Sequence, residues 1–145
     1  MKRFFVSTDA ALLDHDWIRR SLKAEHWGAK LTDQKIDRSI TRSLCFGLYE
    51  NVPDIEGAPA IAIDRRQRGF ARVVTDGATF SSVMDVVVDR DFRGRRLGHM
   101  LMDFVVGHPD VRETVCVLGT KDAIGFYKDF RFKPVETFVM QRDPV

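Results

Sequence analysis

The chain has 145 residues, and its 23 Lys and Arg nearly balance its 21 Asp and Glu, which leaves a formal net charge of +2. A hydrophobic fraction of 44% is typical of a globular domain, and this length is enough to bury one substantial core. So small a net charge argues against a polyanion-binding protein, and no apolar run approaches the roughly 18 residues of a membrane span. We therefore expect a single domain over residues 1–145, located in the cytoplasm, with neither nucleic acid nor membrane as a partner.

The first part of the chain predicts one strand and two helices. Residues 4–6 form a short apolar strand. From Asp14, apolar side chains recur at helix spacing as far as Leu22. Thr32 is a predicted N-cap, and the helix behind it has an apolar stripe at Ile36, Ile40 and Leu44.

The middle of the chain predicts a meander of antiparallel strands. These strands are expected at residues 44–49, 60–63 and 69–74. A turn-rich segment over residues 51–59 and a charged segment over residues 64–68 separate them. The dipeptide Asp76-Gly77 is a strong hairpin signal and leads into the next strand.

The stretch from Ser82 to His99 combines a strand, a turn and the start of a helix. Its apolar strand breaks at a charged turn that contains glycine, and a helix follows to about Val106. Alternation places Val83, Asp85 and Val87 on one face of the strand and Met84, Val86 and Val88 on the other. Such a junction binds anions, because the first N–H groups of a helix lack internal partners and the helix dipole is positive there.

The end of the chain completes an α+β fold. Residues 114–118 form a strand, which makes a β-α-β unit with two parallel strands. A short helix then carries Tyr127, and residues 137–140 supply a last strand. The expected architecture has three layers, with helices on both faces of a mixed, mainly antiparallel sheet. A strand at the sheet edge near Phe138 would allow a homodimer as well as a monomer.

Two motifs resemble those of a known family. The segment Arg93-Gly94-Arg95-Arg96-Leu97-Gly98 resembles the Arg/Gln-x-x-Gly-x-Gly/Ala signature of the GNAT superfamily, the N-acetyltransferases that use acetyl-CoA. Residues 123–132 resemble that family's Ala-x-x-Phe/Leu-Tyr-x-x-x-Gly-Phe element. The order of strands and helices is also similar over nearly the whole chain. The resemblance implies an acyl-CoA N-acyltransferase fold and acetyl-CoA as the acyl donor.

The resemblance also implies which residues hold acetyl-CoA. In the family, backbone amides of the signature loop bind the pyrophosphate, and here these belong to Arg93, Gly94, Arg95, Arg96, Leu97, Gly98 and His99. Arg96 stands where the family usually has a glycine, which leaves the conformation of the loop open, although its guanidinium could add a phosphate contact. The remaining cofactor contacts would come from Val86, Val87, Val88, Thr120, Ala123 and Phe126. Thr120 replaces an Asn found in many members.

Tyr127 matches the family's general acid, since a phenol of pKa about 10 can protonate a leaving thiolate. The acceptor amine needs a base, because an alkylamine is almost wholly protonated at pH 7. Asp85 is the first candidate, directly or through water, because an acid in an apolar strand has its pKa raised by burial. The alternative for Asp85 is a structural ion pair with an arginine such as Arg72. Glu25, at the end of a helix, is a weaker candidate base.

Aromatic and histidine side chains are candidates for acceptor binding. Trp17, His26, Trp27, Phe46 and Phe80 could form an aromatic wall suited to a cationic or aromatic amine. Each of them alone is better explained as a core residue. The four histidines lack the spacing of metal ligands, so no metal is expected.

The resulting hypothesis is an N-acetyltransferase that acts on a primary amine of a small molecule by direct attack in a ternary complex. A non-catalytic acyl-CoA-binding or regulatory module is the alternative. Cys45 and Cys116 lie in apolar stretches and are expected to be buried and reduced, with a disulfide or a nucleophile as the alternatives. Nucleic-acid binding through the arginines at residues 65–68 and 90–96 is least favoured, because they form no basic stripe along a helix.

Overall fold

The structure is a computed structural model that describes residues 2–53, 63–137 and 139–145. Its strands are β1 (Phe4–Ser7), β2 (Leu44–Pro53), β3 (Ile63–Thr75), β4 (Phe80–Val88) and β5 (Val115–Val117). Its α-helices are α1 (His15–Lys23), α2 (Asp33–Thr41), α3 (Leu97–Gly107) and α4 (Ile124–Lys128), and two short 3-10 helices lie at Ala10–Leu12 and Arg90–Phe92. None of the described helices is long and apolar enough to cross a membrane.

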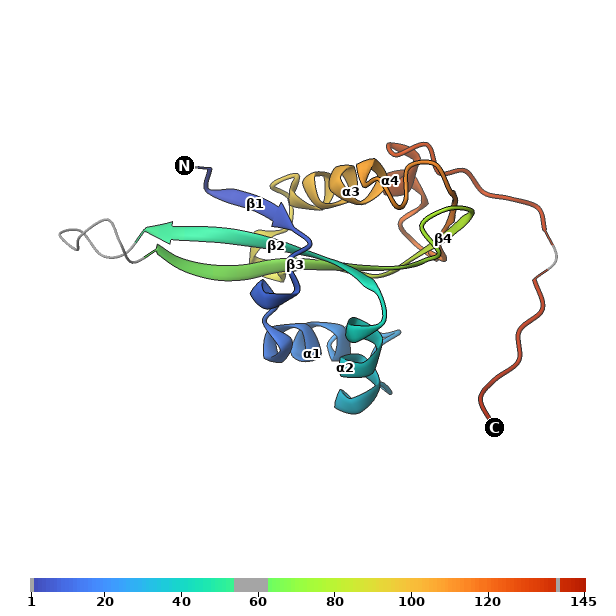
Figure 1. The fold of residues 1–145 in the computed structure, drawn as a ribbon, viewed down its shortest axis with the longest axis horizontal. Helices are drawn as coiled ribbons and strands as arrows, with labels where there is room; N and C mark the ends of the chain where they lie inside the picture. The colour runs from blue at the N-terminus through green and yellow to red at the C-terminus, as the bar shows by residue number, and fades with distance from the viewer. Residues whose placement is uncertain (1, 54–62, 138) are drawn as a thin grey trace.

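The five strands form one sheet in the order β1-β2-β3-β4-β5. Neighbouring strands are antiparallel except for β4 and β5, which are parallel and are joined through α3. Figure 1 shows α1 and α2 on one face of the sheet and α3 and α4 on the other. The predicted three-layer α+β fold, with a mixed sheet and a parallel β-α-β unit, is therefore confirmed.

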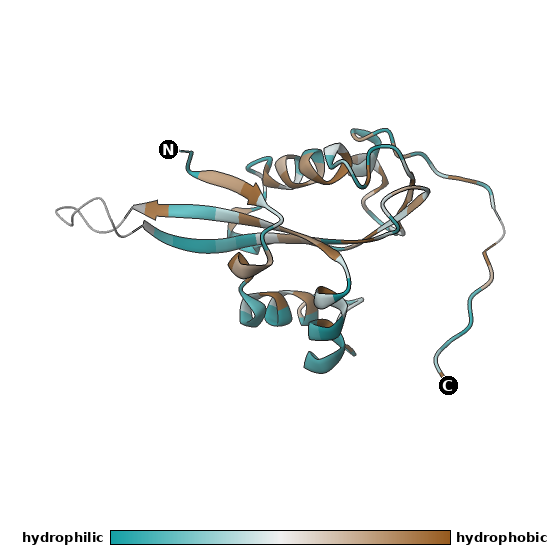
Figure 2. Cartoon of the chain, in the orientation of Figure 1, coloured by the Kyte–Doolittle hydropathy of each residue, from teal (hydrophilic) through white to brown (hydrophobic). Residues whose placement is uncertain are grey.

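Both N-terminal helices begin where the sequence predicts. The Asp14 carboxylate accepts a hydrogen bond from Trp17 N, and the Thr32 hydroxyl accepts one from Lys35 N. The outer sides of α1 and α2 are largely hydrophilic (Figure 2), while their apolar stripes face the sheet. The buried residues between these helices and the sheet are Ile18, Leu22, Ile36, Ile40, Cys45, Phe70 and Val87.

A larger core lies on the opposite face, beneath α3. Leu97, Leu101 and Val105 of this helix are buried against the sheet. Phe46 and Leu48 of β2 are among their partners. Burying a side chain of this size contributes about 1.5–3 kcal/mol, so this face supplies most of the stability that holds α3 in place.

One prediction for the central hairpin needs correction. The charged residues 64–68 do not separate two strands, because they belong to a continuous β3 that pairs with β2. Residues 64–66 are exposed, where this end of the hairpin extends past the helical layers (Figure 1). Gln67 is buried and accepts a hydrogen bond from Asp14 N, and the partly buried Arg68 forms ion pairs with Glu50 and Asp89. Residues 54–62, which include most of the predicted turn, lie outside the described residues.

The hairpin turn at Asp76-Gly77 is confirmed. The Asp76 carboxylate accepts hydrogen bonds from the Thr79 hydroxyl and from the backbone N–H groups of residues 78–80. The Thr79 bond, followed by those of the backbone, holds the pKa of Asp76 well below its ordinary value. Gly77 has a φ of 72°, which glycine adopts without strain.

The predicted last strand is wrong for the residues that the structure describes. Residues 133–137 and 139–145 contain no strand, and Phe138 lies outside the described residues. Phe132 still packs against Tyr127, with ring centroids 6.0 Å apart, but apolar residues beyond it such as Met140 are exposed. The segment leads away from the sheet (Figure 1), so the edge that the sequence offered for a homodimer does not form there.

Candidate active site

A β-bulge in β4 shapes the centre of the molecule. Between Met84 and Val87, β4 has two residues where the neighbouring β3 has one. The first of the two is Asp85, whose φ of 55° lies in the left-handed region, which Asp tolerates better than most residues. An extra residue exchanges the faces of those that follow, so Val83 packs beneath α3 and Val87 packs beneath α1 and α2. The predicted alternation is therefore wrong beyond Met84.

A buried ion pair holds this bulge. Arg72 Nε lies 2.7 Å from Asp85 Oδ2, and Arg72 Nη1 donates a hydrogen bond to Ser43 Oγ at 3.1 Å. The two side chains are only 12% and 10% exposed. Asp85 is thus not the isolated acid that the sequence predicts for a proton acceptor. The ion pair is the alternative that the sequence left open, and it favours a structural role for Asp85.

The bulge lies where β4 has a neighbour on one side only. The parallel pairing of β4 with β5 covers just Phe80–Ser82 of β4. Beyond Ser82, no described strand pairs with β4 on the β5 side. Val86 has no partner residue in either neighbouring strand of the described structure, and Val88 O accepts a hydrogen bond from Arg93 Nε at 3.2 Å instead of from a strand. A ligand could therefore pair with the backbone of β4 at this edge.

A cavity of about 530 Å³ begins at this edge and reaches the start of α3. Most residues predicted to hold acetyl-CoA line it, namely Val86, Val87, Val88, Arg93, Gly94, Arg96, Leu97, Gly98, His99, Ala123 and Phe126. Arg95 lies beside the cavity, with its guanidinium 4.9 Å from the centre of the Phe92 ring. Thr120 borders the neighbouring cavity instead, and its hydroxyl accepts a hydrogen bond from Ala123 N.

We call this cavity the donor cavity, because it is lined by residues predicted to hold the acetyl donor. The start of α3 supplies backbone N–H groups to it. The first hydrogen bond of the helix runs from Met100 N to Arg96 O, so the N–H groups of Leu97, Gly98 and His99 have no helical acceptor. No side chain of the described residues caps this end. The helix dipole adds partial positive charge, so the geometry suits a phosphate group.

The backbone at Arg96 shows which conformation the loop takes where the family usually has a glycine. Its φ of 58° and ψ of 19° are left-handed, the conformation that glycine adopts most easily. Arg96 thus keeps the backbone path of a glycine at a cost of about 1–2 kcal/mol. Gly98 allows a close contact, because a Cβ there would lie 3.3 Å from the Phe126 ring and the ring would have to shift slightly.

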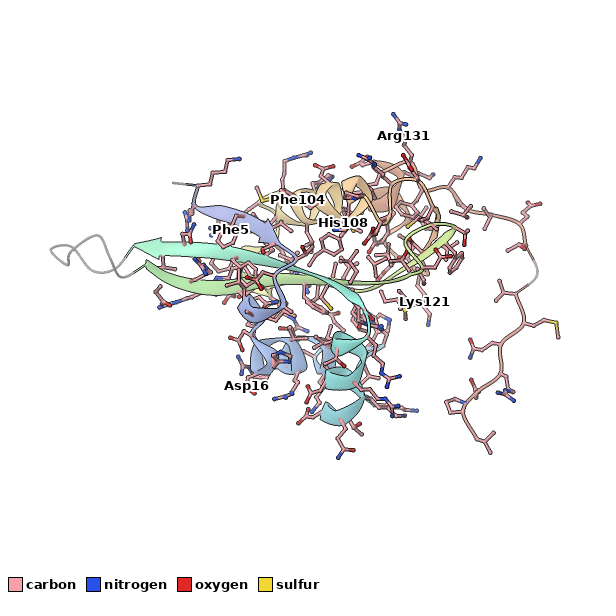
Figure 3. All side chains as sticks on the ribbon, in the orientation of Figure 1. Phe5, Asp16, Phe104, His108, Lys121 and Arg131 are labelled. Carbon is pink, nitrogen blue, oxygen red and sulfur yellow. The ribbon has the colours of Figure 1, made fainter. Side chains whose placement is uncertain are left out.

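A second cavity, of about 830 Å³, lies between the α1–α2 connection, α2, β4 and residues 118–123. His26 and Trp27 line it, as the sequence predicts. Lys121, labelled in Figure 3, comes from its border beside α4. We call it the acceptor cavity, because predicted acceptor-binding residues line it. No pattern in the sequence indicated Lys35, Ser39 or Leu118, because this cavity is assembled from segments far apart in the chain.

The other three predicted acceptor residues lie elsewhere, so the predicted aromatic wall does not form. Trp17 packs against the core beneath α1. Phe46 is 1% exposed in the core on the opposite face, where it meets His108, which Figure 3 labels on the α3 side of the sheet. Phe80 is exposed at the start of β4. Their positions follow from the faces of α1 and β2, which aromatic content alone does not specify.

The donor and acceptor cavities meet at four residues. Glu25, Val86, Ala123 and Tyr127 line both of them. Tyr127 is half-buried, and burial raises the pKa of its hydroxyl, which therefore stays protonated at neutral pH. The Tyr127 hydroxyl, the Glu25 carboxylate and the edge of β4 at Val86 thus surround the junction of the two cavities. A chemical group could pass from one cavity to the other there.

Known proteins similar to the chain identify its family. A family model described as an acetyltransferase (GNAT) domain matches residues 56–134. A crystal structure from Xanthomonas campestris pv. campestris, provisionally described as an acetyltransferase of the GNAT family, is 36% identical with a TM-score of 0.76. That match covers 96% of this chain and 95% of the other. The chain belongs to the GNAT acetyltransferase family.

Two further proteins extend the comparison. A Gibberella zeae protein, provisionally named an acetyltransferase, is 29% identical over 146 residues, which are 93% of this chain and 82% of that protein. Rv2747 from Mycobacterium tuberculosis, whose crystal structure is in complex with CoA and NLQ, shares the fold with a TM-score of 0.65 at 15% identity. The match with Rv2747 covers 94% of this chain and 76% of the other.

The cysteines and histidines of this GNAT acetyltransferase form no further site in the described residues. Cys45 and Cys116 are both free thiols, as expected. Cys45 is buried, and burial raises its pKa to about 11, whereas Cys116 is only partly buried. No group of three His, Cys, Asp or Glu side chains in the described ranges is placed to hold a metal.

The left-handed conformation at residue 96 predicts the stability of two variants. Arg96→Gly and Arg96→Ala both remove the guanidinium, but only glycine removes the backbone strain. Arg96→Gly should therefore be more stable than Arg96→Ala by about 1 kcal/mol in urea unfolding. Equal stabilities would contradict the loop conformation described here.

The buried ion pair predicts a loss of stability when it is broken. Asp85→Asn should lower the free energy of unfolding by about 3–5 kcal/mol, because Arg72 is left buried without its partner. Asn tolerates the left-handed conformation, so the change tests the charge alone. The control is Asp64→Asn, whose exposed pair with Arg66 should matter by less than about 1 kcal/mol. An Asp85→Asn protein of unchanged stability but lost activity would support proton transfer by Asp85.

Proposed function

We propose that this GNAT acetyltransferase transfers the acetyl group of acetyl-CoA to a primary amine of a small molecule by direct attack. The observation that carries the proposal is the junction of the two cavities at Glu25, Val86, Ala123 and Tyr127. Direct attack requires both substrates at once, with the reacting atoms in contact. One cavity for each substrate, with a shared wall beside a general acid, meets this requirement.

The donor cavity has groups suited to each part of acetyl-CoA. The N–H groups of Leu97, Gly98 and His99 would hold the pyrophosphate, and Arg95 and Arg96 add positive charge nearby. The unpaired edge of β4 at Val86 and Val88 would receive the acetyl carbonyl and the amides of the pantetheine arm. Acetyl-CoA brings an activated thioester to the junction, and the chain's own residues orient it there.

Tyr127 is the proposed general acid. When the amine attacks, the C–S bond breaks and a thiolate leaves, and the Tyr127 hydroxyl donates a proton to it. The raised pKa favours this role, because the hydroxyl does not ionise before the reaction. Burial also raises the pKa of Cys116, which disfavours the thiolate that an acyl-enzyme route would need.

Asp85 has a positioning role in this proposal. Its pair with Arg72 fixes the bulge, and the bulge presents the backbone of Val86 to the junction. Proton acceptance by Asp85 stays a prediction from the sequence.

The proposal predicts the outcome of removing either tyrosine hydroxyl. Tyr127→Phe should lower kcat by about 10²-fold or more, measured as thiol release from acetyl-CoA across a panel of amines, with the affinity for acetyl-CoA unchanged. The matched control is Tyr49→Phe, because the buried Tyr49 hydroxyl has no hydrogen-bond partner in the described structure. That change should leave both stability and kcat almost unaltered.

The same assay separates the enzyme from a regulatory module. A module that only binds acyl-CoA would bind acetyl-CoA saturably, release no thiol with any amine and be indifferent to Tyr127→Phe. That combination would contradict the proposed function.

A further inference from the structure

We propose that Glu25, just beyond α1, is the catalytic residue that takes the proton from the acceptor amine. The inference rests on the acetyl transfer proposed above and names the base for it. The reaction needs such a base, because only about one alkylamine molecule in a few thousand is unprotonated at pH 7.

The position of Glu25 distinguishes it from the other carboxylates. Three acids border the acceptor cavity, and they are Glu25, Asp85 and Asp122. Of these, only Glu25 also lines the donor cavity in the described structure. It therefore flanks the same junction as the general acid Tyr127, where the amine nitrogen must meet the acetyl carbon. A base has to reach the proton that it removes, so location is the first criterion.

Exchange with solvent is the second criterion, because a base must release its proton after each turnover. The Glu25 side chain is 21% exposed, and its partner Arg93 is 51% exposed. The Asp85 side chain is 10% exposed, and its partner Arg72 is 12% exposed. Glu25 therefore has a path to water, whereas Asp85 is built into the sheet.

The sequence ranked Glu25 lower because it ends a helix, but two arginines from the loop after β4 fix this end. Arg93 Nη2 donates to Glu25 Oε1 at 3.0 Å, and Arg93 Nε donates to Val88 O at 3.2 Å. Arg90 Nη2 donates to Ala24 O at 3.3 Å. The carboxylate is thus held between the donor loop and the acceptor wall, with Oε2 outside every hydrogen bond found in the described residues.

The protons balance over one turnover. Glu25 takes one proton from the ammonium group and passes it to solvent, which leaves a neutral nitrogen lone pair. The C–N bond then forms, the C–S bond breaks, and its electron pair goes to sulfur. Tyr127 donates its proton to the sulfur and takes a proton back from the nitrogen. The nitrogen keeps one hydrogen, as the N–H of the new amide. The net products are the acetylated amine, CoA thiol and one proton in solution.

The other titratable or charged groups around the acceptor cavity are His26, Lys35, Arg72, Asp85, Lys121, Asp122 and Tyr127. The donor cavity, which Glu25 also lines, adds Arg93, Arg96 and His99. Neutralising Glu25 could alter the field that these groups create, so the test must separate proton transfer from a change of charge. The control is Asp16→Asn, which removes a charge from α1 at an exposed position away from both cavities. Asp16 is labelled in Figure 3.

The experiment compares Glu25→Gln with the unaltered protein across pH, with an alkylamine and an aryl amine as acceptors. At pH 7, kcat/KM for the alkylamine should fall by about 10²-fold or more in Glu25→Gln. The defect should shrink below about 10-fold near pH 10, because the amine then loses its proton to water without help. The aryl amine is already neutral at pH 7, so its acetylation should fall by less than about 10-fold. Asp16→Asn should keep the normal pH profile.

Three results would overturn the inference. Glu25→Gln could match the unaltered protein at pH 7, which would mean that the base lies elsewhere. It could be slower by one constant factor at every pH and with both amines, which would indicate a structural role. If the unaltered protein acetylates no amine at all, the proposed function fails and the role of Glu25 fails with it.

Discussion

The ion pair between Arg72 and Asp85 is the interaction on which the arrangement of the site depends. It joins β3 to β4 at the bulge and is buried on both sides. Beyond the bulge the faces of β4 exchange, so Val87 anchors the α1–α2 core while Val86 and Val88 pack toward α3. Because β4 has already lost its pairing with β5 at this point, its backbone is free to meet a ligand. A buried pair is weak evidence for added stability, and its consequence here is a defined geometry.

Much of the fold follows from local signals in the sequence. The start of α1 after Asp14, the cap at Thr32, the turn at Asp76-Gly77 and the parallel β-α-β unit form as predicted, because each depends on residues close together in the chain. The bulge was not predictable in the same way, since alternation assumes one residue per step on both strands. The polar residues 64–68 concealed part of β3 for a related reason. Residues 64–66 are exposed, and the polar groups of Gln67 and Arg68 are paired with residues far away in the chain.

The residues of the donor cavity could be predicted from the sequence more completely than those of the acceptor cavity. Nearly all predicted donor residues line one cavity, because they come from a contiguous signature loop, strand and helix. The acceptor cavity is assembled from distant segments, and only His26 and Trp27 of the five predicted residues line it. The candidate bases show the same limit. Burial and pairing depend on distant partners such as Arg72 and Arg93, so the sequence favoured Asp85 as the base, whereas the base that we propose is Glu25.

The central claim is that the donor and acceptor cavities meet at Tyr127, and a crystal structure with bound CoA tests it most directly. The pyrophosphate should lie within hydrogen-bond distance of the N–H groups of Leu97, Gly98 and His99. The pantetheine arm should run along Val86 and Val88, with the sulfur close enough to the Tyr127 hydroxyl to receive a proton, about 3.2–3.5 Å. CoA bound with its phosphates away from the start of α3, or with its sulfur remote from Tyr127, would rule out this arrangement.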